Sequence, residues 1–146
     1  MARQEDIKFF LAALLVLLLD QITKTVIRNN IKINDTVIII RNIFSVTHAT
    51  NTGITFGMLK GYNPLLIWVY VIIIGIILYY YNNIDKKIRI PLALVLGAVI
   101  SNLVDRALLG AVTDFIKISL WPAFNIADLS ASIGVIILVI YFWKKK

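Results

Sequence analysis

Long apolar segments constrain the fold of this chain more than any other feature. They run from about residue 7 to 27, 65 to 81, 90 to 109 and 125 to 143. A helix needs roughly 17–25 mostly apolar residues to cross a bilayer, and each segment reaches this length. Hydrophobic residues form 60% of the sequence, against roughly 45–50% in soluble domains. We therefore predict an integral membrane α-helical protein in which residues 1–146 form a single membrane domain with four transmembrane helices.

The connection between the first two apolar segments has a different character. Residues 37–40 and 43–47 are rich in β-branched and aromatic residues, which favour strands. Asparagine-containing pairs around them are typical of turns. We expect a small β-sheet over residues 34–59, outside the core of the bilayer. The connection 110–124, between the last two apolar segments, is expected to be a loop.

The basic residues indicate how the chain is oriented. The net charge is +7, and much of it lies directly beyond apolar segments, as the positive-inside rule predicts for cytoplasmic ends: Lys86, Lys87, Arg89 and Lys144–Lys146. This placement argues against a nucleic-acid-binding protein. Four crossings return the chain to its starting side, so we expect both termini in the cytoplasm. No small-residue cleavage site follows the first apolar stretch, which we interpret as a retained span.

Four of the eight acidic residues lie in or beside the apolar segments: Asp20, Asp105, Asp114 and Asp128. An ionised carboxylate at the bilayer centre costs at least about 3 kcal/mol, and such residues usually mark a functional site. The four-span topology brings all four near the surface opposite the termini. We therefore expect the active site near the extracytoplasmic surface.

The residue types available narrow the chemistry of such a site. The sequence has no cysteine and one histidine, His48, which excludes a thiol nucleophile and a histidine cluster for a metal. A serine–lysine dyad stays open for Ser101, Ser119, Ser130 or Ser132 with Lys24 or Lys117, although nothing in the sequence fixes a lysine beside a serine. Two neighbouring carboxylates share one proton and can hydrolyse a peptide bond without a metal. Asp114 and Asp128 are the preferred pair, since Asp20 and Asp105 have Lys24 and Arg106 as basic neighbours.

Five segments, in chain order, resemble motifs of the lipoprotein signal peptidase (signal peptidase II) family. The resemblance extends over nearly the whole chain, and its five segments are Asp20–Lys24, Asn51–Gly57, Asn102–Arg106, Val112–Ile116 and Phe124–Asp128. The chain departs from the family pattern at several positions. Ala98 and Ser101 stand where the family usually has glycines. Ile54 and Thr55 replace its usual alanines.

The resemblance implies an aspartic endopeptidase without a cofactor or metal. It would remove the signal peptide from a diacylglyceryl-modified prolipoprotein, cutting before the lipidated cysteine. Asp114 and Asp128 would be catalytic, and the family's supporting and substrate-binding positions correspond to Asp20, Lys24, Asn51, Gly53, Asn102, Asp105, Arg106 and Asn125. Residues 34–59 would form the family's extracytoplasmic β-cradle. The resemblance also implies a monomer in the bacterial cytoplasmic membrane, surrounded by membrane lipid and inhibited by globomycin-type peptides.

Other interpretations of these residues remain. Asp114 and Asp128 could be ordinary helix-terminus residues, and Asp105 with Arg106 an architectural ion pair. A small transporter or channel would also contain buried charges, but would spread them through the full depth of the membrane. A membrane scaffold would not need the acidic cluster. We expect His48 at the surface of the sheet, and Trp68, Tyr79–Tyr81 and Trp143 at the membrane interface.

Overall fold

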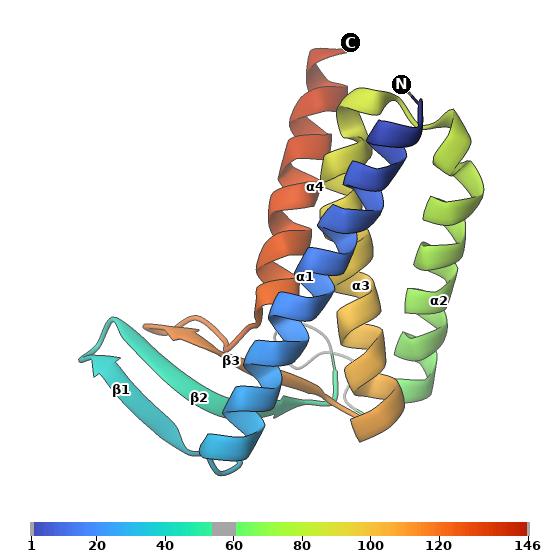
Figure 1. Ribbon diagram of the computed structural model, residues 1–146. Helices are drawn as coiled ribbons and strands as arrows, with labels where there is room; N and C mark the ends of the chain where they lie inside the picture. The colour runs from blue at the N-terminus through green and yellow to red at the C-terminus, as the bar shows by residue number, and fades with distance from the viewer. Residues whose placement is uncertain (1, 54–60, 146) are drawn as a thin grey trace.

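A computed structural model describes residues 2–53 and 61–145 (Figure 1). The end of the predicted sheet, residues 54–59, therefore lies outside the described residues. Within the described residues, long helices and strands alternate with short connections: α1 (Ala2–Asn30), β1 (Thr36–Ile40), β2 (Phe44–Asn51), α2 (Asn63–Tyr80), η2 (Tyr81–Asn83), η3 (Lys86–Ile88), α3 (Arg89–Leu109), β3 (Val112–Ile118) and α4 (Ile126–Lys144).

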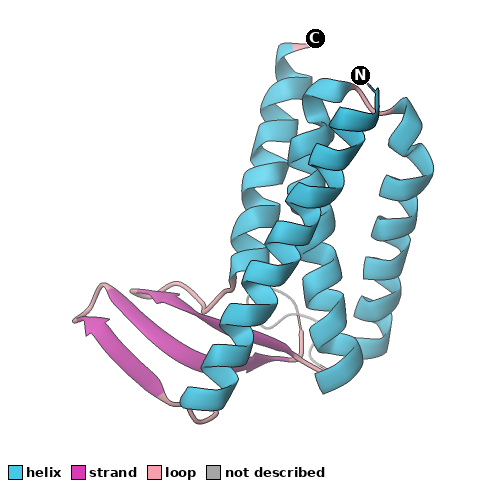
Figure 2. Ribbon diagram, viewed as in Figure 1, coloured by secondary structure: helices cyan, strands magenta, loops and turns pink. Residues whose placement is uncertain are grey.

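Four helices in the described part of the chain are long and apolar enough to cross a membrane. The helix α3 packs against α1, α2 and α4, so it is the most buried of the four. Most apolar side chains of α2 and α4 are exposed, as expected where lipid replaces water. A three-stranded sheet lies at the end of the bundle opposite the two termini (Figure 2). The prediction of a four-helix membrane fold with a small sheet is confirmed.

A glycine allows α1 and α3 to approach closely. A Cβ added at Gly97 would lie 2.3 Å from the carbonyl oxygen of Ala13 and 2.9 Å from the Cβ of Val16. Real Cβ atoms do not come this close, so the two helices would have to separate. Close backbone approach at small residues is the usual way in which membrane helices gain packing energy.

Gly97→Ala is expected to destabilise the bundle by about 1–3 kcal/mol through overpacking. Gly75→Ala in α2 is the matched control, because a Cβ there meets nothing within 4 Å. Thermal unfolding in detergent should show a lower Tm for the first variant and an unchanged or slightly higher Tm for the second. Equal Tm values would show that the α1–α3 contact is not close.

The sheet is antiparallel with the strand order β1-β2-β3. The expectation of a loop over 110–124 was wrong for residues 112–118, which form β3. Gly110 ends α3 in the left-handed conformation, with φ 75°, and the chain then pairs with β2, where Asp114 lies opposite Ala49. Ala49 lies 65 residues before Asp114 in sequence, so local sequence could not reveal this pairing.

Two side chains expected at surfaces are buried. His48 is 5% exposed and its Nδ1 lies 2.7 Å from the Ile31 carbonyl oxygen. The register of β2 shifts between Val46 and Ala49, and this irregularity lets Thr47 and His48 both face inward. Tyr81 is also buried, because it packs against Phe9 in the core, and its hydroxyl donates to Asp6 at 2.6 Å. Trp68, Tyr79 and Trp143 are exposed.

Candidate active site

The Asp114 carboxylate is buried on β3, with only 3% of the residue exposed. Both of its oxygens accept hydrogen bonds from asparagine side chains. Asn51 Nδ2, at the end of β2, donates to Oδ2 at 2.9 Å, and Asn125 Nδ2 donates to Oδ1 at 2.7 Å. The sheet therefore carries this aspartate to the start of α4.

Asp128 lies in the first turn of α4. Asn125 caps this helix, because its Oδ1 accepts from the backbone N–H of Asp128 at 2.8 Å. Asn102 Nδ2, from α3, donates to Asp128 Oδ1 at 2.9 Å. Asn125 thus contacts both candidate residues, the carboxylate of Asp114 and the backbone of Asp128.

Lys24 forms the centre of a buried ion cluster beneath these aspartates. Its Nζ lies 2.6 Å from Asp20 Oδ2 and 3.2 Å from Asp105 Oδ2, and it donates to Asn102 Oδ1 at 2.8 Å. The Lys24 and Asp20 side chains are completely buried. Because the Asn102 oxygen accepts from Lys24, its amide NH₂ is directed to Asp128. The buried lysine therefore orients a group that binds a candidate catalytic carboxylate.

Asp20 and Asp105 hold the two elements that carry Asp114 and Asp128. Asp20 Oδ1 accepts from the backbone N–H of Ala127 at 2.9 Å, at the positive end of α4. Asp105 Oδ2 accepts from the backbone N–H of Thr113 at 3.0 Å. The first contact joins α1 to α4 and the second joins α3 to β3, and the basic neighbours in sequence suggested neither of them.

Arg106 does not pair with Asp105, so the predicted ion pair between these neighbours was wrong. Adjacent residues on a helix point in different directions. Asp105 faces α1, where Lys24 and Arg28 lie at 3.2 and 3.4 Å. Arg106 donates instead to Asn63 Oδ1 at 3.2 Å and to the carbonyl oxygen of Gly53.

Hydrogen bonds and ion pairs connect all ten predicted site residues into one network. Gly53 completes it, because its N–H donates to Asn51 Oδ1 at 3.0 Å and its carbonyl accepts from Arg106. The catalytic and supporting roles of these residues stay predictions. Among the described residues, no group of three or more histidine, aspartate or glutamate side chains could hold a metal ion.

Comparison with known proteins identifies the relatives of this chain. The family model described as signal peptidase (SPase) II matches residues 12–144. The chain belongs to the signal peptidase II family. This membership makes it a peptidase. Its four apolar helices, together with its likeness to solved bacterial membrane enzymes, indicate a bacterial membrane protein.

Similar proteins of this family match over most of their length. The chain is 33% identical to the lipoprotein signal peptidase of Halothermothrix orenii, covering 94% of this chain and 96% of the relative. It is 41% identical to that of Moorella thermoacetica, covering 89% of each. A bacterial membrane enzyme structure determined by the in meso method at 2.3 Å resolution superposes with a TM-score of 0.89 and 30% identity, over 94% of this chain and 88% of that one.

The structure of this signal peptidase II family member adds residues that were not among the predicted site residues. Gln21 donates to Asp105 Oδ1 at 2.9 Å and to Ser101 Oγ at 2.9 Å. Arg28 Nη1 donates to Thr113 Oγ1 at 3.2 Å. The spacing of Arg28, four residues after Lys24 on the same helix face, was an available signal. The hydroxyl of Ser101, which the sequence left open as a nucleophile, donates a hydrogen bond to Asp20 Oδ2 at 2.7 Å.

Burial and, to a smaller extent, the negative charge of Asp128 raise the pKa of Asp114 from 3.8 to about 7. The hydrogen bonds from Asn51 and Asn125 act against this shift, since they favour the ionised carboxylate. At neutral pH, Asp114 is therefore close to half-protonated. Such a pKa suits a group that gives and takes protons near pH 7.

A carboxyl group whose pKa is higher in the folded than in the unfolded protein stabilises the fold while it is protonated, and this stabilisation is lost as the group ionises. The contribution of Asp114 to the free energy of unfolding therefore falls as pH rises from about 4 to about 7, and Asp114→Asn removes this loss. We expect the stability of Asp114→Asn relative to the unchanged protein to rise by up to about 4 kcal/mol across this pH range. Tm measured in detergent from pH 5 to 8 checks this.

Asp85→Asn is the control for this pH experiment. Hydrogen bonds from Tyr141 and from the Lys87 backbone lower the pKa of this exposed carboxyl, so its ionisation is complete below pH 5. Its Tm relative to the unchanged protein should stay constant from pH 5 to 8. If the Tm of Asp114→Asn relative to the unchanged protein were also constant from pH 5 to 8, the pKa of Asp114 would not be raised.

Proposed function

We propose that this chain is an aspartic endopeptidase that removes the signal peptide from diacylglyceryl-modified prolipoproteins, cutting before the lipidated cysteine. Its relatives from Halothermothrix orenii and Moorella thermoacetica are named lipoprotein signal peptidases. The observation that carries the aspartic mechanism is the bridge by Asn125, which contacts the Asp114 carboxylate at 2.7 Å and the Asp128 backbone at 2.8 Å. Because one side chain contacts both residues, this bridge supports a mechanism in which the two carboxyl groups act on the same peptide bond.

In the proposed reaction, Asp114 and Asp128 share one proton. The ionised Asp128 takes a proton from a water molecule, whose oxygen attacks the scissile carbonyl carbon. The protonated Asp114 gives its proton to the carbonyl oxygen, forming a neutral diol. Asp128 then passes its proton to the leaving nitrogen, Asp114 recovers a proton from one diol hydroxyl, and the C–N bond breaks. The raised pKa of Asp114 supports its role as the proton donor.

The proposed site would lie near the extracytoplasmic surface of the bacterial cytoplasmic membrane. The sheet and the start of α4 are at the end of the bundle opposite the termini (Figure 1). The lysines of η3 and of the end of α4 lie at the other end, which the positive-inside rule assigns to the cytoplasm. A monomer could then receive its substrate from the lipid, with the acyl chains still in the bilayer.

The test uses the purified chain, a diacylglyceryl-modified prolipoprotein and separation of precursor from product by gel. We expect cleavage of the modified precursor and inhibition by globomycin. The same precursor without the diacylglyceryl group is the matched control and should stay intact. If the folded chain cleaved neither form, ion flux in vesicles would be measured, because a transporter would then be the better interpretation.

A further inference from the structure

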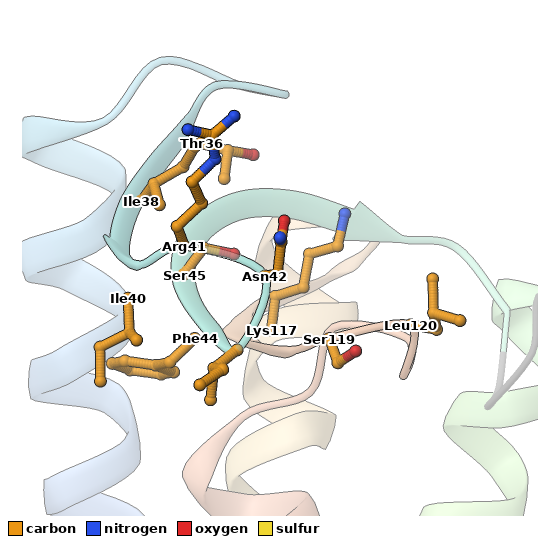
Figure 3. A pocket seen from close by; sticks show the side chains of 11 residues that line it. Thr36, Ile38, Ile40, Arg41, Asn42, Phe44, Ser45, Lys117, Ser119 and Leu120 are labelled. Atoms are coloured by element: carbon orange, nitrogen blue, oxygen red, sulfur yellow. The ribbon is translucent and has the colours of Figure 1, made fainter.

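A cavity lies on the face of the sheet opposite Asp114. Its volume is about 460 Å³, and it is formed by β1, the β1–β2 turn, and the end of β3 with the residues that follow (Figure 3). Ser45 pairs with Lys117 across the strands, and both line the cavity. Lys117 lies three positions after Asp114 on β3, so the two side chains point to opposite faces. The cavity is therefore separate from the candidate active site.

The cavity has a positive charge that no acidic group balances. Arg41 and Lys117 are both exposed lining residues, and within residues 2–53 and 61–145 neither side chain forms an ion pair. None of the eleven lining residues is acidic. The side chains of Arg41, Asn42 and Lys117 extend to the same side of the sheet (Figure 3). Two cations with hydroxyl and amide neighbours form a suitable environment for a phosphate group.

The same region exposes an unusual number of large apolar side chains. Every residue of β1 is exposed, and Ile38, Ile43 and Leu120 are 67%, 60% and 99% exposed. The side chains of Ile40 and Phe44 extend to the side opposite the cations, toward the helices (Figure 3). Cations on one side and aliphatic groups on the other are typical of a segment at a membrane interface.

The position of the hairpin identifies what covers this surface. The β1–β2 hairpin projects sideways from the bundle, at the level where α4 begins (Figure 1). The helices cross the membrane, so a hairpin that extends beyond them overlies the lipid that surrounds them. Water would be an unfavourable neighbour for this many exposed isoleucines, whereas the acyl region of a leaflet accommodates them.

We propose that this cavity binds the headgroup phosphate of an anionic phospholipid. Arg41 and Lys117 would hold the phosphate, with the hydroxyl groups of Ser45 and Ser119 nearby. The acyl chains would pass Ile40 and Phe44 toward the core of the bilayer. The site fixes the sheet on the membrane surface, and it does not depend on the proposed peptidase function.

The experiment measures binding directly. The chain has no cysteine, so Leu120→Cys provides a single attachment point for an environment-sensitive fluorophore at the rim of the cavity. The labelled protein in detergent is titrated with short-chain phosphatidylglycerol, short-chain phosphatidylcholine, glycerol phosphate or an acidic octapeptide. We expect a saturable change in emission with phosphatidylglycerol, and a much weaker response to the other three ligands at the same concentration.

Removing the two cations tests which residues bind. Each basic residue near an anionic lipid surface strengthens binding about fivefold, so Arg41→Ala with Lys117→Ala should weaken phosphatidylglycerol binding about 30-fold. Lys86→Ala with Lys87→Ala removes the same charge at the other end of the bundle and should leave binding at the label unchanged. Unchanged binding in the first double variant would overturn the proposal. Equal binding of glycerol phosphate would assign the site to free phosphate, and equal binding of the octapeptide would assign it to a polypeptide.

Discussion

Asp128→Asn and Asp114→Asn are each expected to lower the rate of prolipoprotein cleavage by at least about 10³-fold. Asparagine has nearly the same shape as aspartate but cannot take a proton from water or give one to a leaving group. In Asp128→Asn, the new side chain can still accept from Asn102, which donates to Asp128 Oδ1 at 2.9 Å. The fold should therefore survive, and the loss should appear in kcat rather than in Tm. Single-turnover cleavage on a gel measures it.

Asp85→Asn serves as the control for both variants. This carboxylate lies outside the candidate site, where it accepts from the backbone of Lys87 and from Tyr141. We expect cleavage at the unchanged rate. If Asp114→Asn or Asp128→Asn cleaved as fast as Asp85→Asn, the proposed pair would be wrong, even if the chain is a prolipoprotein peptidase.

The second large effect is expected at the buried lysine. Lys24→Met keeps the length of the side chain but leaves Asp20 and Asp105 without the cation that lies 2.6 and 3.2 Å away. Removing one partner of a buried ion pair typically costs about 3–5 kcal/mol, because the remaining charge is uncompensated. We expect a correspondingly lower Tm in detergent, together with slower cleavage, because Asn102 loses the donor that orients it toward Asp128.

A double variant separates the lost charge from the lost packing. Asp20→Asn in the Lys24→Met background removes one unpaired carboxylate, and the asparagine oxygen can still accept from Ala127, whose N–H lies 2.9 Å from Asp20 Oδ1. The double variant should recover part of the lost Tm. If it were less stable than Lys24→Met alone, the destabilisation would come from packing and the electrostatic account would be wrong.

Hydropathy predicted the helices well, because a run of apolar residues the thickness of a bilayer has few other stable structures. The strands Thr36–Ile40 and Phe44–Asn51 were also visible, since β-branched residues are concentrated there. The strand Val112–Ile118 was missed, although five of its seven residues are β-branched or aromatic, because the segment was interpreted only as a connection between two helices.

The site shows the same limit of local reasoning. Sequence placed Lys24 beside Asp20, and the helix geometry makes this pair at 2.6 Å. Sequence also suggested Arg106 as the partner of Asp105, which is wrong because consecutive side chains on α3 face different helices. Contacts such as Asp105 with the Thr113 backbone depend on how strands and helices meet, which no local pattern encodes.

The contact between Asp20 and the Ala127 backbone joins positions 107 residues apart. During synthesis, α1 enters the membrane long before the ribosome has translated α4. Until then, Asp20 and Lys24 have no helix terminus to hold, and Asp114 lacks the Asn125 amide. The nascent chain would therefore be unable to hydrolyse any precursor passing through the same insertion machinery, and it would become active only when its last helix docks.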